Sequence, residues 1–262
     1  MQDNSALGRA LDIVRDLRRR CAWDRVQTRE TLRPYLIEEV FELDHALNEG
    51  DPVAIREEVA DLMLHLAWQL VLGEERGEFN ADQVADDLTR KMKRRHPHLF
   101  DLGPHEPWER LKRKERSHGV LEGLPPGLPD LLRAYRLQER AVGVGFDWPD
   151  VGGPLQKVRE ELMEVEGELQ WPEPSQRRQD ALTEEIGDLL FAVVNLARKA
   201  GVQPGPALDR ANRKFAARFA AIERLAAERH IDVSTAGLEV LDRLWDEVKQ
   251  GERENGGTGE RE

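Results

Sequence analysis

Apolar residues recur every three or four positions along most of the chain, which is the period of an amphipathic α-helix. From Leu7 to Arg20, for example, Leu11, Val14 and Leu17 continue one apolar side. No segment alternates apolar and polar residues over the length of a strand. The pattern therefore predicts an all-α fold. The predicted helices cover residues 7–20, 31–48, 54–72, 80–95, 108–116, 131–142, 154–170, 179–200, 207–229 and 239–249.

Proline-rich and polar interruptions divide the chain. The run Leu124–Pro129 cannot continue a helix, because a proline disfavours the helical conformation of the residue before it. We therefore expect residues 1–101 to form an N-terminal module, 102–129 a connecting segment and 130–250 a C-terminal module. Residues 251–262 contain no apolar side chain and are expected to form a disordered tail.

The two predicted modules repeat one acidic pattern, which is the most informative feature of the sequence. Each copy reads EExxE, then a gap that contains proline, then ExxD. The gap predicts a turn, so that each copy forms two antiparallel helices. The first copy consists of Glu38, Glu39, Glu42, Glu58 and Asp61, and the second of Glu160, Glu161, Glu164, Glu185 and Asp188.

Helical spacing places these acids opposite one another. Side chains three positions apart share a helix face, so Glu161 and Glu164 would face the second helix of the pair. Four like charges repel unless a cation lies among them. An all-oxygen set suits Mg²⁺, or Mn²⁺ as a substitute, and Mg²⁺ usually takes substrate phosphates as further ligands. The predicted metal ligands are Glu161, Glu164, Glu185 and Asp188, with a second possible site at Glu39, Glu42, Glu58 and Asp61.

A solvated acidic face, or a set of structural ion pairs, is the alternative interpretation, since acidic runs are common on helix surfaces. The residues after the two aspartates argue against it. Apolar residues follow Asp61 at positions 62–64 and Asp188 at positions 189–194. A carboxylate at the start of a core helix is costly without a partner.

Basic pairs follow both acidic patterns. Lys91 and Arg95 lie four positions apart, and so do Lys214 and Arg218. This spacing places both cations on one helix face, where they could grip phosphate oxygens. A solvated basic face is the alternative, but the repetition behind both acidic patterns favours phosphate contact.

Composition narrows the classes of function. The chain has 39 Lys+Arg and 51 Asp+Glu, a formal net charge of −12, which argues against general nucleic-acid binding. Its one cysteine, Cys21, excludes an intramolecular disulfide and a multi-cysteine zinc site. A zinc site at His96, His98 and His105 is disfavoured, because no cysteine or acid lies at ligand spacing.

The hydropathy pattern also bears on location. The longest strongly apolar stretch, Leu189–Ala197, has about half the length that a bilayer span needs. The first residues lack the basic-then-apolar pattern of a signal peptide. We therefore expect a cytoplasmic protein that binds neither membrane nor nucleic acid.

Several stretches resemble the MazG-type nucleoside triphosphate pyrophosphohydrolases, in the two-module form found in bacteria. The resemblance covers about residues 7–250. Besides both acidic patterns, it rests on residues 21–24, 27–28, 94–98, 144–148, 157–161, 185–191 and 211–215 and on the pair Trp245 and Lys249.

The resemblance implies a helical fold that forms homodimers, with bundles built from both chains. It implies hydrolysis of NTPs or dNTPs to the monophosphate and pyrophosphate with Mg²⁺, in nucleotide-pool cleaning or a stress response. It also implies that the C-terminal module is catalytic and the N-terminal module mainly structural. Carried over residue by residue, Lys157, Lys214, Arg218 and Lys249 would contact phosphates, Trp245 would contact the nucleotide, and the four acids of the second copy would bind metal.

Differences between the copies also favour the C-terminal module. Gly187 precedes Asp188 and would allow a ligand or another backbone to approach closely. Asn195, seven residues after Asp188, could read a sugar or base, although a buried amide with satisfied hydrogen bonds explains it equally well. The first copy has Trp68 at the matching position, which would fill such a pocket.

The hypothesised reaction is attack of a metal-activated water on a phosphoryl group of the triphosphate, with pyrophosphate leaving. The predicted catalytic residues are Glu160, as general base, and Glu161. Two other functions stay open at this point. One is a pyrophosphohydrolase dedicated to a single nucleotide, of the phosphoribosyl-ATP or dUTP type, and the other is a non-catalytic helical regulatory or interaction protein.

Overall fold

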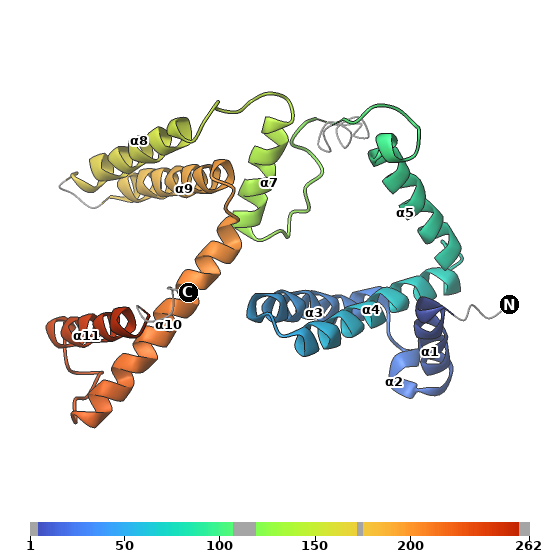
Figure 1. Cartoon of the computed structure of the whole chain (residues 1–262), viewed down its shortest axis with the longest axis horizontal. Helices are drawn as coiled ribbons and strands as arrows, with labels where there is room; N and C mark the ends of the chain where they lie inside the picture. The colour runs from blue at the N-terminus through green and yellow to red at the C-terminus, as the bar shows by residue number, and fades with distance from the viewer. Residues whose placement is uncertain (1–4, 107–118, 172–174, 257–262) are drawn as a thin grey trace, which may run out of the picture. The chain divides into compact units, whose positions relative to one another are not determined.

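The structure, a computed structural model, describes residues 5–106, 119–171 and 175–256. The chain divides into two compact units, Met1–Glu106 and Pro107–Glu262, and the division falls inside the predicted connecting segment. Every regular element of the described residues is helical (Figure 1). The predicted all-α class is therefore confirmed.

Local sequence explains where the helices of the first unit begin. Thr28 and Asn80 each start a helix by accepting a hydrogen bond from a backbone N–H three residues later. Asp51 caps the next helix directly before Pro52, where a missing N–H costs nothing, and Gly50 turns the chain with φ +73°. The elements are α1 (Ala6–Arg20), α2 (Ala22–Arg25), α3 (Arg29–Glu49), α4 (Pro52–Glu75), α5 (Ala81–Arg95) and the 3₁₀ turn η1 (Pro97–Leu99).

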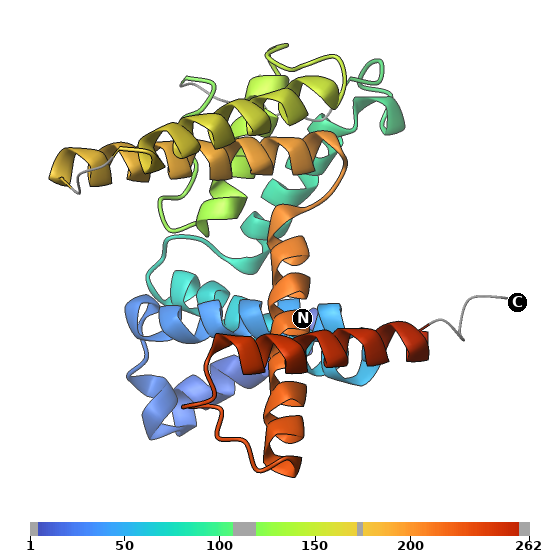
Figure 2. The same cartoon turned by 90° about the vertical axis from the view of Figure 1, so that its left-hand side faces the viewer.

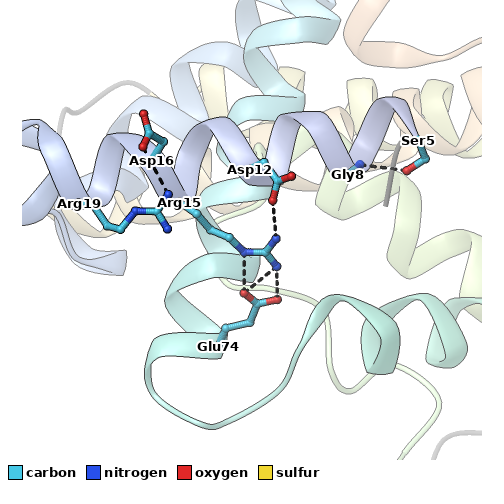
Figure 3. A network of polar contacts seen from close by, with 7 residues as sticks. All are labelled: Ser5, Gly8, Asp12, Arg15, Asp16, Arg19 and Glu74. Atoms are coloured by element: carbon cyan, nitrogen blue, oxygen red, sulfur yellow. Dashed lines mark hydrogen bonds and ion pairs between the residues drawn. The ribbon is translucent and has the colours of Figure 1, made fainter. Parts of the chain in front are cut away.

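The core of the first unit lies where α1 and α3 pack on α4. Trp68 of α4 is buried there among residues such as Leu11, Val14 and Leu32. Figure 3 shows the polar contact at one end of this packing, where Arg15 of α1 donates three hydrogen bonds to Glu74, two of 2.9 Å and one of 3.2 Å. These contacts fix α4, and α4 in turn carries the second half of the first acidic pattern.

The second unit is built on the α8–α9 pair, whose helices lie side by side in Figures 1 and 2. Arg178, in the first turn of α9, donates to the backbone oxygens of Glu168 and Leu169 at the end of α8, both at 2.9 Å. This contact fixes the register of the pair. The elements are α7 (Asp130–Val142), α8 (Gly152–Leu169), α9 (Gln176–Lys199), α10 (Pro204–Glu228) and α11 (Leu238–Gly256).

The remaining helices of the second unit form a separate contact. The first helix of the unit, α7, packs against α9. The last helix, α11, packs on α10 around Ile222, Ala226 and Leu244. Figures 1 and 2 both show α11 lying across the second half of α10, away from the α8–α9 pair. Two clusters of helices therefore share this unit.

The structure corrects one prediction and leaves another outside its range. Residues 251–256 continue α11 instead of beginning a disordered tail. Adding residues to an existing helix costs little, and Glu252 is held by Arg218 of α10 at 2.6 Å, a contact that local composition does not reveal. The helix predicted at 108–116 lies outside the described residues.

Large apolar side chains lie exposed on the helices that carry the acidic patterns. Phe41 of α3 is 58% exposed, and Met163 of α8 and Leu190 of α9 are 59% and 55% exposed. Phe215 of α10 is 58% exposed. Large apolar side chains that gather on a protein surface often mark an interaction surface. Among the described residues, no helix is long and apolar enough to cross a membrane.

Candidate metal and nucleotide site

The carboxylates of the second acidic pattern meet between α8 and α9, as their spacing predicts. Donor oxygens of Glu161, Glu185 and Asp188 lie within 4.8 Å of one another. Those of Glu160, Glu161 and Glu164 do so as well. Glu161 belongs to both groups and is therefore the centre of the cluster.

Glu161 has the most unusual surroundings of the five acids. Its side chain is only 5% exposed, and its Oε1 receives an ion pair from Lys157 Nζ at 2.5 Å. Lys157 also contacts Glu160 Oε1 at 2.6 Å. The Lys157 hydrogen bond lowers the pKa of Glu161, so this carboxylate stays ionised. Its Oε2, in contrast, is buried without a hydrogen-bond partner, which is costly for a charged oxygen.

The neighbouring carboxylates show the strain of an uncompensated charge cluster. The pKa of Glu164 is raised, first by the adjacent Glu161 carboxylate and then by burial and other neighbouring charge. The pKa of Glu185 is raised by burial and by the charges of Glu161 and Asp188. A divalent cation would reverse both effects. The buried unpartnered oxygen and the all-oxygen donor set therefore fit Mg²⁺ or Mn²⁺.

The first acidic pattern forms a similar cluster between α3 and α4. Donor oxygens of Glu39, Glu58 and Asp61 lie within 4.8 Å of one another. Burial and then the charge of Asp61 raise the pKa of Glu39, and burial and then the charge of Glu42 raise the pKa of Glu58. Glu42 thus lies near this trio without joining its closest set. The predicted second acidic cluster is present in the first unit.

Of the predicted substrate-binding residues of α10 and α11, Arg218 lies beside Trp245. The Arg218 guanidinium lies 5.6 Å from the Trp245 ring centre, and the Phe215 ring lies 5.4 Å from it. Lys249 lies 3.9 Å from Asp246. In the described part of the chain, no hydrogen bond or ion pair joins Lys214, Arg218 or Lys249 to the carboxylates of α8 and α9. One chain therefore brings Lys157 to the acidic cluster, but not these three cations.

Asn195 lines a pocket of about 300 Å³ within the second unit, the lower end of the range for small-molecule sites. Its Oδ1 accepts hydrogen bonds of 2.8 and 3.0 Å from Arg198, which also binds Asp147. The amide oxygen is therefore satisfied, as the alternative interpretation expects. Gln138 adds a second amide to the pocket: its Nε2 donates to the Phe191 backbone oxygen, while its Oε1 is buried without a partner.

Comparison with known proteins assigns the family. The sequence profile of the MazG nucleotide pyrophosphohydrolase domain matches residues 27–100. Two similar proteins are named nucleoside triphosphate pyrophosphohydrolases. That of Escherichia coli (strain K12) is 37% identical over 250 residues, which cover 91% of this chain and 94% of that protein. That of Thermotoga maritima is 39% identical over 238 residues, which cover 88% of this chain and 90% of that protein. The chain belongs to the MazG family.

A further relative contains a similar sequence as part of a longer chain. YabN of Bacillus subtilis, an uncharacterised protein, is 38% identical over 253 residues, which cover 92% of this MazG chain but 51% of YabN. The family profile itself matches the first unit, which contains Glu39, Glu58 and Asp61. The first unit therefore keeps the sequence character of a MazG domain.

The two units of this MazG protein differ at three matched positions beside their acids. Where the second unit has Lys157, four residues before Glu161, the first has Tyr35. Trp68, which matches Asn195, is 3% exposed and part of the first unit's core. It occupies space at the position where the second unit has a pocket.

The third difference is His65, whose place beside the first acidic cluster was not predicted from the sequence. His65 matches Ala192, one turn after the aspartate in each unit, and its residue is 7% exposed. Burial lowers its pKa, so the imidazole is neutral near pH 7, although the charge of Asp61 acts in the opposite direction. The available signal was a single histidine within the apolar run 62–66.

Proposed function

We propose that this protein hydrolyses nucleoside triphosphates, NTPs or dNTPs, to the monophosphate and pyrophosphate with Mg²⁺ at the acidic cluster of the second unit. Membership of the MazG family makes the chain a nucleoside triphosphate pyrophosphohydrolase. The observation that carries the site is the buried, unpartnered Oε2 of Glu161 among carboxylates from two helices. The proposed ligands are Glu161, Glu164, Glu185 and Asp188, with Mn²⁺ as a possible substitute.

A bound Mg²⁺ would neutralise phosphate charge and lower the pKa of the attacking water. The protein's own groups have separate tasks. Lys157 keeps Glu161 ionised and, with its side chain 40% exposed, can also contact a phosphate oxygen. Glu160 is exposed beside the cluster and is the proposed base that takes the proton of the attacking water.

The cations on α10 and α11 require a second copy of the chain in this proposal. Among the described residues, Lys214, Arg218 and Lys249 of α10 and α11 make no ion pair with the acids of α8 and α9, whereas α8, α9 and α10 expose large apolar side chains. A homodimer that covers these faces would bring the cations and Trp245 of one chain toward the acids of the other. Cations placed there would stabilise charge on the leaving pyrophosphate.

The pocket around Asn195 and Gln138 is the proposed place for the sugar or base. Trp148 closes one side and packs so tightly on Gly153 of α8 that a side chain at position 153 would collide with it. Phe146, 78% exposed, offers a ring at the pocket's edge. The unpartnered Oε1 of Gln138 would accept a hydrogen bond from an N–H group of the base.

This arrangement supports the second unit as the catalytic one and the first as mainly structural. The second unit has Lys157 and the pocket, while the first has Tyr35 and a core Trp68 in their places. The proposed role is cleaning of the cytoplasmic nucleotide pool or a stress response that acts on it. Nucleoside triphosphates, the substrates of the proposed reaction, belong to that pool.

Product analysis tests the proposal. The protein is incubated with Mg²⁺ and a panel of NTPs and dNTPs, and the products are followed by phosphorus NMR. Monophosphate with pyrophosphate supports the proposed reaction, and the ranking of substrates shows its breadth. Diphosphate with inorganic phosphate would contradict the cleavage site, and cleavage of one nucleotide alone would replace broad hydrolysis by a dedicated enzyme.

A further inference from the structure

Arg198 of α9 joins two walls of the pocket that Asn195 lines. Its guanidinium donates twice to Asn195 Oδ1, at 2.8 and 3.0 Å, and once to Asp147 Oδ1 at 2.6 Å. The Arg198 side chain is only 11% exposed, so most of this charged group is buried. Asp147 lies in the chain between Phe146 and Trp148, which both line the pocket. Arg198 therefore holds this aromatic loop and the Asn195 amide together.

These contacts decide which atom of the Asn195 amide remains for a ligand. A guanidinium carries only donors, so the amide oxygen must point toward Arg198. The Nδ2 group then lies on the other branch of the amide, and among the described residues no hydrogen bond uses it. Because Asn195 lines the pocket, its amide offers the pocket an N–H donor.

The amide of Gln138 is fixed in the opposite sense. Its Nε2 donates to the Phe191 backbone oxygen at 2.8 Å, and a carbonyl oxygen can only accept. The amide oxygen Oε1 is therefore the atom left over, and in the described part of the chain it is buried without a partner. Such an oxygen is costly until a ligand donates to it. The pocket thus presents one fixed acceptor and one fixed donor.

We propose that Arg198 is a positioning residue, which fixes the hydrogen-bond pattern with which this pocket reads a nucleobase. The inference rests on the proposed binding of the base in the pocket. Proteins that hold a single base read it by hydrogen bonds to its Watson–Crick edge and by stacking on aromatic side chains. One donor and one acceptor fit an edge that carries an N–H group beside an acceptor atom, and all four common bases have such a pair. The pattern therefore suits a broad range of nucleotides.

Lys199 provides the control that separates positioning of the amide from support of the loop. Its Nζ lies 2.9 Å from Asp147 Oδ2 and also donates to the Trp148 backbone oxygen. No hydrogen bond among the described residues joins Lys199 to Asn195. Lys199 therefore holds the same loop as Arg198 does, but it does not orient the amide.

The test measures the affinity of the full chain for AMP, CMP, GMP and UMP by isothermal titration calorimetry, which does not depend on hydrolysis. In Asn195→Asp, the carboxylate still accepts from Arg198, but an acceptor replaces the N–H donor that faces the base. Guanine alone among the four bases carries N–H groups on two neighbouring atoms of its edge, so it suits two acceptors. We expect the affinity for GMP to rise at least about tenfold relative to the other three in this variant.

Arg198→Met tests the positioning itself. Without the guanidinium, the Asn195 amide can turn its oxygen toward the pocket, so the relative affinity for GMP should rise in the same direction, by at least about threefold. Lys199→Met should leave the ratios among the four monophosphates within about twofold of wild type. If Arg198→Met fails to fold, as circular dichroism would show, Arg198→Lys takes its place. A lysine that pairs with Asp147 leaves the amide free and should give the same shift.

Three results would overturn the inference. An equal loss of affinity for all four monophosphates in the Arg198 variants would make Arg198 a structural residue. Unchanged ratios in Asn195→Asp, or no binding of any monophosphate by wild-type protein, would mean that this amide does not read the base. Failure of the proposed hydrolysis is a separate result, because product analysis of the wild-type protein detects it.

Discussion

The proposed structural role of the first unit leads to a stability prediction for the variant Trp68→Ala. Trp68 is 3% exposed in the core of the first unit, beside Leu11 and Val14, and the Arg18 guanidinium lies 5.5 Å from its ring centre. Truncation would leave a cavity that the packed helices α1 and α4 cannot fully close. None of the proposed catalytic groups lies in this unit.

The expected size follows from these contacts. Truncating a buried tryptophan costs about 3–5 kcal/mol. Loss of the cation–π contact with Arg18 accounts for about 0.5–1 kcal/mol of that. A unit of this size loses about 4–8 °C of melting temperature per kcal/mol, so the transition of the first unit should fall by roughly 12–40 °C.

Trp23→Ala is the matched control within the same unit. Trp23 is 53% exposed and makes an edge contact with Tyr35 at 6.4 Å between ring centres. Loss of such an aromatic pair costs about 0.5–1.5 kcal/mol, which corresponds to roughly 2–12 °C.

Differential scanning calorimetry of both variants, with pyrophosphate release measured below the first transition, checks the prediction. Trp68→Ala should retain turnover within about twofold of wild type, because the proposed catalytic groups belong to the other unit. Equal melting temperatures for the two variants would refute the core argument. A loss of turnover in Trp68→Ala while the first unit is still folded would refute the structural role of that unit.

Three further predictions concern the second unit. Glu252→Gln removes the carboxylate that forms an ion pair with Arg218, which frees the guanidinium for a phosphate. The KM for a triphosphate should therefore fall about two- to fivefold in steady-state kinetics. An unchanged KM would contradict phosphate contact by Arg218. Asn195→Ala should change the kcat/KM ranking among bases by roughly tenfold in a substrate panel, whereas an identical ranking would remove Asn195 from recognition. The pKa values of Glu164 and Glu185 are raised, so protons compete with metal at higher pH than usual. Mg²⁺ affinity measured by calorimetry should therefore fall as the pH drops from about 7 to about 5, and a pH-independent affinity would contradict this.

Much of the site could be predicted from sequence because it depends on short-range helical geometry. The three-residue spacing of Glu161 with Glu164 and of Glu185 with Asp188 placed each pair on one face, and the proline-containing gap made the two helices antiparallel. These are properties of neighbouring residues, so the acidic clusters of both units follow directly from the pattern.

Other features depend on contacts between distant residues, which a local pattern does not contain. The last helix continues through Glu252 because Arg218, on another helix, holds that side chain. His65 comes within 3.6 Å of Glu39, which lies 26 positions earlier in the chain. Nothing in the local sequence distinguishes Gln138 from other polar residues. The structure shows that its Nε2 donates to the Phe191 backbone oxygen while its Oε1 is buried without a partner.

The central claim is that the acidic cluster around Glu161 carries the hydrolysis. The most direct test measures pyrophosphate release by Glu161→Gln beside Glu184→Gln, which neutralises an exposed acid next to the cluster. Gln keeps the shape of the buried side chain but removes the charge that a metal ion needs. We predict that Glu161→Gln loses at least about a hundredfold in kcat/KM with Mg²⁺ while remaining folded, and that Glu184→Gln stays within about twofold of wild type. Near-wild-type turnover in folded Glu161→Gln would contradict the assignment of hydrolysis to this cluster.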